Sequence, residues 1–193
     1  MSHNSITNES ETFEIGETTV HRLGFGAMRL CGENIIGAPD DEAAAREVVE
    51  HAVDCGVDFI DTADSYGPGV SERLIGEAIG DPDDVVVATK AGLLRNDAGD
   101  WIPHGDPDYI RNQVLTSLDR LRTDTIDLYQ FHKPDDDTPF EDSIAAFAEL
   151  KDDGFVDELG VSNVSAELLD RAREQVEIAT VQNRYNLHDR GSR

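Results

Sequence analysis

Five apolar stretches of the chain each end in polar or ionisable residues. The residues at these ends are Asp61, Lys90, His132, Ser162 with Asn163, and Gln182 with Asn183. Short apolar runs are typical of buried parallel strands, and the carboxyl ends of parallel strands in a βα barrel meet at the face that carries the active site. One polar residue at a strand end usually caps a turn. Five in succession predict a single site that combines acidic, basic and amide groups.

Tyr66 lies five residues after Asp61 and enters a loop of glycine and proline, so its phenol can turn back over the same strand ends. A phenol with an ordinary pKa of about 10 is a poor acid at neutral pH. An adjacent ammonium stabilises the phenolate and lowers that pKa. We expect Lys90 to provide the ammonium and Asp61 to keep it charged. His132 would donate a second hydrogen bond to a developing oxyanion.

Several other kinds of site are not indicated. The nearest match to a G-x-G-x-x-G dinucleotide fingerprint begins at Gly24 and has Arg29 in place of the third glycine. The sequence contains no H-x-H, C-x-x-C or H-E-x-x-H motif, so we expect no metal, and no G-x-S-x-G motif marks a nucleophilic serine.

The elements that must position these residues alternate regularly. We expect strands over 23–28, 57–61, 85–89, 126–131, 158–161 and 178–182. We expect helices over 40–55, 71–79, 107–121, 139–152 and 166–175. A β-hairpin around Gly16-Glu17 precedes them, and residues 96–105 are predicted to form a loop in which Trp101 lines a pocket or merely packs. This order implies βαβ units and a parallel sheet, which both a doubly wound sheet and a barrel would satisfy.

Composition places limits on the partners. The 193 residues, which we interpret as one domain over 1–193, carry 41 acidic and 16 basic side chains and a net charge of −25. This charge repels nucleic acid and anionic membranes. Only three of the basic residues are lysines, which together with the acidic surface is typical of adaptation to high salt. No long apolar run indicates a membrane span or signal peptide, and Cys31 and Cys55 have no framework spacing, so we expect a cytoplasmic protein.

The motifs around the predicted site resemble those of the aldo/keto reductase family. The run GVDFIDTADSYGPGVSERLIGEAI over residues 56–79 is similar to the family signature. The segments VVVATKAG, DLYQFHKPD, LGVSN and VQNRYN follow in the family's order and spacing. The resemblance covers nearly the whole chain, from the hairpin to Arg190. It implies a (β/α)8 TIM barrel of the aldo/keto reductase type with an N-terminal β-hairpin.

The resemblance also implies roles for individual residues. The family's catalytic tetrad falls on Asp61, Tyr66, Lys90 and His132. Its nicotinamide contacts fall on Ser162, Asn163 and Gln182, and the backbone of Gly26-Ala27-Met28 passes beside the nicotinamide ribose. Asp61 is implied to bind the cofactor as well. The implied reaction is the reduction of an aldehyde or ketone to an alcohol, with hydride from NADPH and a proton from Tyr66. NADH is an alternative cofactor, and the implied partner is a small carbonyl substrate.

About six βα units are recognisable, whereas the family has eight. We expect an incomplete barrel without its last two units, which in the family bind the cofactor pyrophosphate and 2′-phosphate. Such an open sheet would expose its edge strands and favour self-association. Two alternatives to an active reductase remain, namely a catalytically impaired fragment of one and a non-catalytic regulatory subunit with the same fold.

Overall fold

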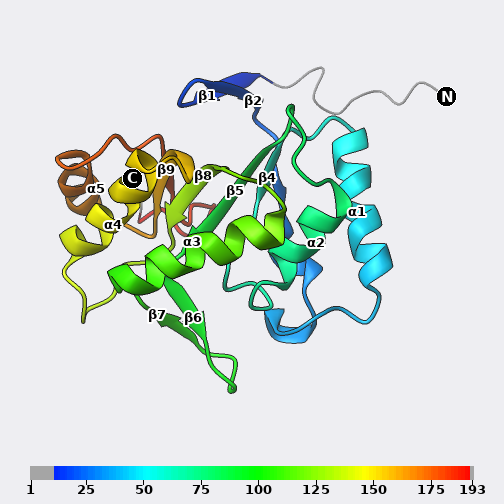
Figure 1. Ribbon diagram of the computed structural model, residues 1–193, viewed down its shortest axis with the longest axis horizontal. Helices are drawn as coiled ribbons and strands as arrows, with labels where there is room; N and C mark the ends of the chain where they lie inside the picture. Colours follow the sequence, from blue (N-terminus) through cyan, green and yellow to red (C-terminus); the bar gives the residue numbers. More distant parts are fainter. Residues whose placement is uncertain (1–10, 192–193) are drawn as a thin grey trace.

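A computed structural model describes residues 11–191 and is built around a curled, parallel six-stranded sheet (Figure 1). The strands follow the order β10-β9-β8-β5-β4-β3. Their bounds are β3 Phe25–Gly26, β4 Phe59–Asp61, β5 Val86–Ala91, β8 Ile126–Phe131, β9 Val156–Ser162 and β10 Thr180–Gln182. Strands β3 and β10 do not pair with each other, so the sheet is an open arc with two free edges. The expected incomplete barrel is confirmed.

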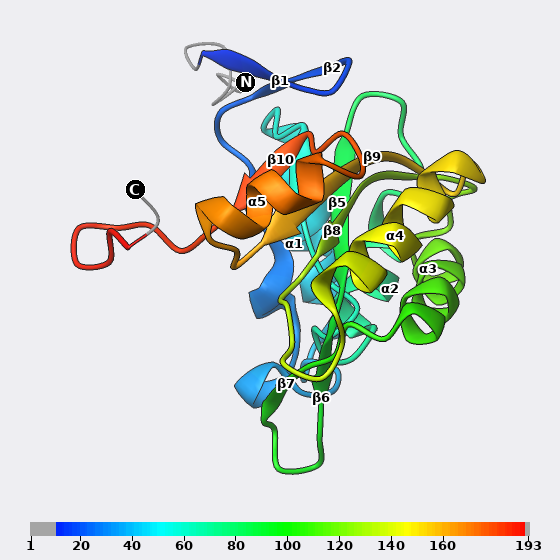
Figure 2. The same ribbon diagram turned by 90° about the vertical axis from the view of Figure 1, so that its left-hand side faces the viewer.

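Five helices connect successive strands and cover the outer face of the sheet (Figures 1 and 2). They are α1 Glu42–Asp54, α2 Val70–Ala78, α3 Pro107–Leu121, α4 Phe140–Asp152 and α5 Ala166–Arg173. Side-chain caps begin three of them. The Asp41 carboxylate accepts from the Ala44 amide at α1, Asp106 accepts from Tyr109 at α3, and Ser165 accepts from Leu168 at α5. Each cap satisfies an amide that the first helical turn leaves unpaired.

Two antiparallel hairpins lie at opposite ends of the sheet (Figure 2). The first joins β1 Thr12–Ile15 to β2 Thr18–His21 and covers the amino ends of the strands. The second joins β6 Leu93–Arg95 to β7 Trp101–Pro103 at the carboxyl ends. The first hairpin was expected. The second corrects the prediction of a loop over 96–105, because its three-residue strands are too short to produce a visible alternation of apolar residues.

Strand alternation divides the buried residues between two faces. On β5, Val86, Ala88 and Lys90 point to the inner side of the arc, where Val86 and Ala88 pack with Ile15 and Val20 of the first hairpin. Val87 lies on the outer side, in the cluster that packs against α1 and α2. The inner face is therefore apolar near the amino ends and becomes polar at the carboxyl ends.

The main differences from the expected boundaries occur at strand ends. The strand expected over 23–28 contains only Phe25 and Gly26, because Ala27–Leu30 turns into a 3-10 helix. The strand over 156–162 is longer than expected, and α5 ends at Arg173. Within the described residues, no helix is long and apolar enough to cross a membrane.

Candidate active site

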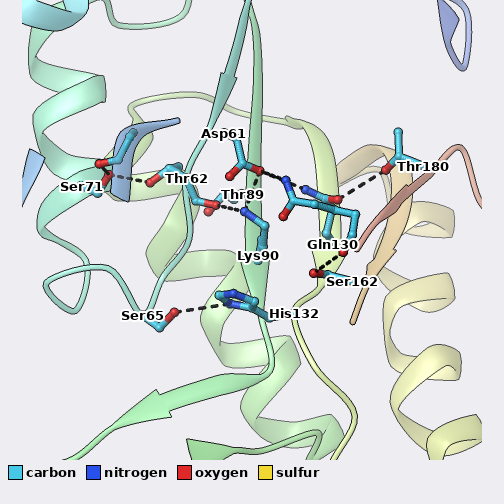
Figure 3. Close-up of polar contacts among 12 residues, drawn as sticks. Asp61, Thr62, Ser65, Ser71, Thr89, Lys90, Gln130, His132, Ser162 and Thr180 are labelled. Carbon is cyan, nitrogen blue, oxygen red and sulfur yellow. Dashed lines mark hydrogen bonds and ion pairs between the residues drawn. The ribbon is translucent and has the colours of Figure 1, made fainter. Parts of the chain in front are cut away.

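A buried ion pair lies at the centre of the carboxyl-end face (Figure 3). Asp61 is the last residue of β4, and Lys90 lies on the neighbouring strand β5. The Lys90 Nζ donates to Asp61 Oδ1 at 2.6 Å and to the Thr62 carbonyl oxygen at 2.7 Å. The lysine is completely buried, and this burial lowers its pKa while the charge of Asp61 acts in the opposite direction. One of the three ammonium protons remains for another partner.

Tyr66 and His132 complete the group that the sequence predicted. Tyr66 follows β4 in a tight loop that requires positive φ at Gly67 (83°) and Gly69 (76°), a conformation that glycine adopts without steric cost. The loop turns the ring back over the sheet, with the Lys90 Nζ 5.5 Å from its centroid. His132 directly follows β8, and its ring centroid lies 5.8 Å from that of Tyr66. The four side chains therefore converge, as expected.

The pKa of Tyr66 moves in the direction opposite to our expectation. Burial raises this pKa, and the negative charges of Asp61 and Asp64 raise it further. Within the described chain the Tyr66 hydroxyl has no hydrogen-bond partner, yet it remains in contact with solvent. Tyr66 is thus a protonated phenol at neutral pH whose hydroxyl is available to a ligand.

His132 is held in its neutral form. Burial, with a further contribution from the charge of Lys90, lowers its pKa from 6.5 to about 3. The Ser65 hydroxyl lies 3.4 Å from Nδ1 of the ring. A neutral imidazole carries one N–H, and donation by Ser65 to Nδ1 leaves that proton on Nε2. His132 can then donate a hydrogen bond without adding a second positive charge beside Lys90.

The three side chains expected to contact nicotinamide lie at the ends of the last two strands. Ser162 Oγ donates to the Gln182 carbonyl oxygen at 2.8 Å, and Asn163 Nδ2 donates to the His132 carbonyl oxygen at 3.0 Å. The Gln182 side-chain amide donates to Asp61 Oδ1 at 2.9 Å. In the described part of the chain, Asn163 Oδ1 and Gln182 Oε1 accept no hydrogen bond. Two amide acceptors are therefore available to a donor group.

The segment Gly26-Ala27-Met28 lies at the other edge of the arc. Gly26 pairs with Asp61 in the register of β3 and β4, and a Cβ atom placed on Gly26 would meet no atom within 4 Å. Ala27 is buried, and Met28 is partly buried against Tyr66. The backbone at Gly26 thus borders open space next to the ion pair, although these residues and those at β10 are on separate edges of the sheet.

Sequence reasoning missed Gln130, which was read as part of an apolar strand. Its side chain is almost fully buried on the inner face, opposite Lys90 in the β5–β8 register. Its Nε2 lies 3.4 Å from Asp61 Oδ1, and its Oε1 lies 3.5 Å from Thr180 Oγ1 (Figure 3). One signal could have identified it, because Gln130 is two residues before His132 and so must share its face of the strand.

A second buried polar group lies behind the site, on the helix side of the sheet. Glu72 accepts from Thr89 Oγ1 at 2.7 Å and from Arg120 Nη1 at 3.0 Å, while Asp64 Oδ2 accepts from the Tyr109 hydroxyl at 2.5 Å. Glu72 lies in the first turn of α2, and its side chain is fully buried. In the part of the chain that the structure describes, the other oxygen of Asp64 is buried without a hydrogen-bond partner. Burial together with the charge of Glu72 raises the pKa of Asp64 to about 7.

Comparisons with known proteins agree with this geometry. Residues 22–193 match the model of the aldo/keto reductase family. Pyridoxine 4-dehydrogenase of Escherichia coli is 36% identical over 189 residues, which are 94% of this chain and 66% of that protein. The aldo-keto reductase yakc [NADP(+)] of Schizosaccharomyces pombe is 35% identical, over 91% of this chain and 52% of its own length.

Solved structures give the same result. The glycerol dehydrogenase AKR11B4 from Gluconobacter oxydans superposes with a TM-score of 0.83 and 37% identity, covering 98% of this chain and 57% of that structure. The holo form of AKR11C1 from Bacillus halodurans superposes with a TM-score of 0.77 and 32% identity, over 91% of this chain and 58% of that one. The chain therefore spans between about half and two thirds of the length of these four relatives.

Proposed function

The chain belongs to the aldo/keto reductase family, and on this basis we propose that it reduces the carbonyl group of a small aldehyde or ketone with a nicotinamide cofactor. One observation carries the proposal. A fully buried lysine, paired with Asp61 at 2.6 Å, lies 5.5 Å from the ring centroid of a tyrosine whose hydroxyl has no hydrogen-bond partner among residues 11–191. Such a group has no evident structural purpose, because burying a charged pair seldom stabilises a fold. It is suited to proton transfer.

Tyr66 is the proposed general acid. Because burial raises its pKa, the phenol keeps its proton at neutral pH until an oxygen of developing negative charge accepts it. The Lys90 ammonium beside the ring then stabilises the charge that forms on the phenol oxygen. Asp61 has an indirect role, since without its carboxylate the buried Lys90 would lose its proton more readily.

His132 is the proposed second donor to the substrate oxygen. The neutral ring can direct Nε2–H at a carbonyl oxygen while Ser65 contacts Nδ1. Donors from two sides fix the position of that oxygen, and such preorganised donors stabilise charge as it develops. A charged imidazolium would instead be repelled by the Lys90 ammonium.

The described residues fit the nicotinamide end of a dinucleotide. The acceptors Asn163 Oδ1 and Gln182 Oε1 would bind the carboxamide NH2, and Ser162 would support both through its hydrogen bonds to the Gln182 backbone and the Asn163 side chain. The open space beside Gly26, continued by Ala27 and Met28, would admit a ribose. When bound, the reduced nicotinamide supplies a hydride. Gln182 also contacts Asp61, so cofactor binding and the Asp61–Lys90 pair share one residue.

NADPH is our proposed cofactor, with NADH as the alternative. Support comes from a relative at 35% identity whose name includes NADP(+). The substrate is proposed only as an uncharged or weakly polar carbonyl compound, because Trp101 meets the Tyr66 ring edge-on and Met28 packs against the cluster that contains Tyr66.

The composition supports a proposal about conditions rather than chemistry. We infer that this single domain, 1–193, functions in the concentrated salt of a cytoplasm, since its 41 acidic residues repel one another less when screened. Thermal unfolding should then shift to higher temperature as KCl is raised. An unchanged or lower midpoint would contradict this inference.

The direct test of the proposed acid is the substitution Tyr66→Phe. Oxidation of NADPH in the presence of a simple aldehyde should fall by about 10²–10⁴-fold, the usual contribution of a positioned general acid. Tyr185→Phe is the matched control, because Tyr185 is 53% exposed near the end of the described chain. Equal rates in the Tyr66 and Tyr185 variants would remove Tyr66 from the mechanism. A wild-type rate of zero would contradict activity of this chain.

A further inference from the structure

The hairpin β6–β7 places an aromatic residue beside the proposed acid. Trp101 begins β7, and its ring meets that of Tyr66 edge-on, with centroids 6.2 Å apart and an interplanar angle of 86°. The indole is 39% exposed, so packing alone does not hold it. Another contact must therefore fix the orientation of this large, half-exposed ring.

Arg95, at the end of β6, provides that support. Its guanidinium carbon lies 3.7 Å from the Trp101 ring centroid, the distance of a stacked cation–π contact. Its N–H groups donate to the carbonyl oxygens of Ile35, Asn34 and Gly99, each at 2.9 Å. Although the chain has 41 acidic residues, no ion pair joins Arg95 to a carboxylate within the described part. Nη1 and Nη2 of the guanidinium therefore bind three carbonyls and its face covers one ring, while Nε is buried without a partner among the described residues.

Two of the carbonyls that Arg95 binds, those of Asn34 and Ile35, belong to a strained segment beside Tyr66. Asn34 and Ile35 have φ values of 56° and 62°, and this left-handed conformation is unfavourable for a β-branched residue. The Ile35 carbonyl also accepts from the Gly67 amide at 3.2 Å, and the Gly37 amide donates to the Gly67 carbonyl at 3.2 Å. Strain of this kind persists when surrounding contacts determine the conformation.

We propose that Arg95 is a positioning residue that connects three segments, namely residues 33–37, the Tyr66-Gly67 turn and the β6–β7 hairpin. It holds Trp101 as a fixed wall next to the Tyr66 hydroxyl. One face of the indole is covered by the guanidinium, and the remaining surface contacts the substituent of the carbonyl substrate. The role in substrate selection rests on the proposed function, whereas the connection between the segments does not.

The connection can be tested without cofactor or turnover, because Trp101 is the single tryptophan of the chain. In Arg95→Met, we expect tryptophan emission to shift to longer wavelength and acrylamide quenching to increase about twofold, since the cation–π contact and three hydrogen bonds are lost. Arg22→Met is the matched control, as Arg22 is exposed and pairs with Glu11 next to the opposite hairpin. Arg95→Lys should resemble Arg95→Met, because lysine keeps the charge but lacks the planar fork.

Hydrogen exchange separates a local connection from general destabilisation. In Arg95→Met, the amides of Gly37 and Gly67 should exchange faster while those of β8 remain protected. Emission and quenching equal to those of Arg22→Met, or faster exchange throughout the sheet, would overturn the proposal.

Steady-state kinetics test the role in selection. The KM of Arg95→Met for benzaldehyde should rise roughly two- to fivefold relative to that of Arg22→Met, because Arg95 holds the ring that contacts the substituent of the substrate. An unchanged KM for benzaldehyde would refute substrate selection. A chain that is inactive but shows the expected fluorescence change would contradict the proposed function and leave the role of Arg95 in place.

Discussion

Replacing Asp61 by asparagine should reveal how strongly the buried ammonium depends on its carboxylate. Lys90 is fully buried, and the Asp61 side chain is 18% exposed. Removing one partner of a buried pair typically costs about 3–5 kcal/mol in the free energy of unfolding. Asparagine retains a neutral acceptor, and the Thr62 carbonyl remains at 2.7 Å. We therefore expect a loss near the lower limit, about 3 kcal/mol, equivalent to roughly 6–12 °C in Tm for a chain of this size.

The pH dependence of the lost unfolding free energy identifies the cause of the loss. Burial lowers the pKa of Lys90, and removing Asp61 lowers it further. The folded variant then binds fewer protons than the unfolded chain between the depressed pKa and the ordinary value of 10.5, so its stability rises with pH across that window. The difference in unfolding free energy between the wild type and Asp61→Asn should become smaller as Lys90 loses its proton. In the Asp61→Asn/Lys90→Met double variant, this dependence should disappear and stability should partly recover.

Urea unfolding followed by far-UV circular dichroism at constant ionic strength, over a series of pH values, measures both effects. Asp119→Asn is the matched control, because Asp119 is exposed on α3 and removes the same charge. The reasoning would be refuted if Asp61→Asn were as stable as Asp119→Asn. A deficit independent of pH would also refute it, since it would mean that the unpaired ammonium is not the source of the loss.

Three other predictions concern stability and association. The pKa of Asp64 is raised from 3.8 to about 7, so the folded state binds the Asp64 proton more tightly than the unfolded chain does. The free energy of unfolding should therefore fall by up to about 4 kcal/mol as pH rises through this window. In urea unfolding at a series of pH values, Asp64→Asn should lose this slope, and a slope equal to that of the wild type would contradict the prediction. Gly76→Ala should destabilise the chain by at least about 1–3 kcal/mol, because the added Cβ atom would lie too close to the Arg120 carbonyl oxygen. A Tm equal to that of the wild type would show that α2 and α3 can move apart to admit the methyl group. The unpaired edges β3 and β10, with Val181 42% exposed, should make the 193-residue chain self-associate in light scattering, whereas a monodisperse monomer would count against this.

The sequence was most informative where one rule of strand geometry applied. Asp61, Lys90 and His132 could be grouped because parallel strands end at a common face, and the structure brings them together. The five helices and the parallel strands were predictable from apolar periodicity, whereas the incomplete barrel was expected from the family resemblance. The strand at Phe25–Gly26 was overestimated because an apolar run does not reveal where a 3-10 turn begins.

Contacts between distant segments could not be predicted. Glu72 and Asp64 lie on the helix side of the sheet, and their burial depends on Arg120 and Tyr109 of α3, which periodicity does not pair with them. The pKa of Tyr66 was expected to fall because only the nearby cation was considered. Its burial and the carboxylates around it have the larger effect, and neither can be read from spacing along the chain.

Transfer of a labelled hydride tests the central claim most directly. The chain is incubated in concentrated KCl with benzaldehyde and NADPH that carries deuterium at C4 of the nicotinamide, and the alcohol is analysed by mass spectrometry. Both C4-deuterated epimers of the cofactor are tried. We predict benzyl alcohol with one deuterium on the carbinol carbon for the wild type and for Tyr185→Phe, and little or none for Tyr66→Phe. Absence of labelled alcohol from the wild type, or equal labelling by Tyr66→Phe, would contradict the account.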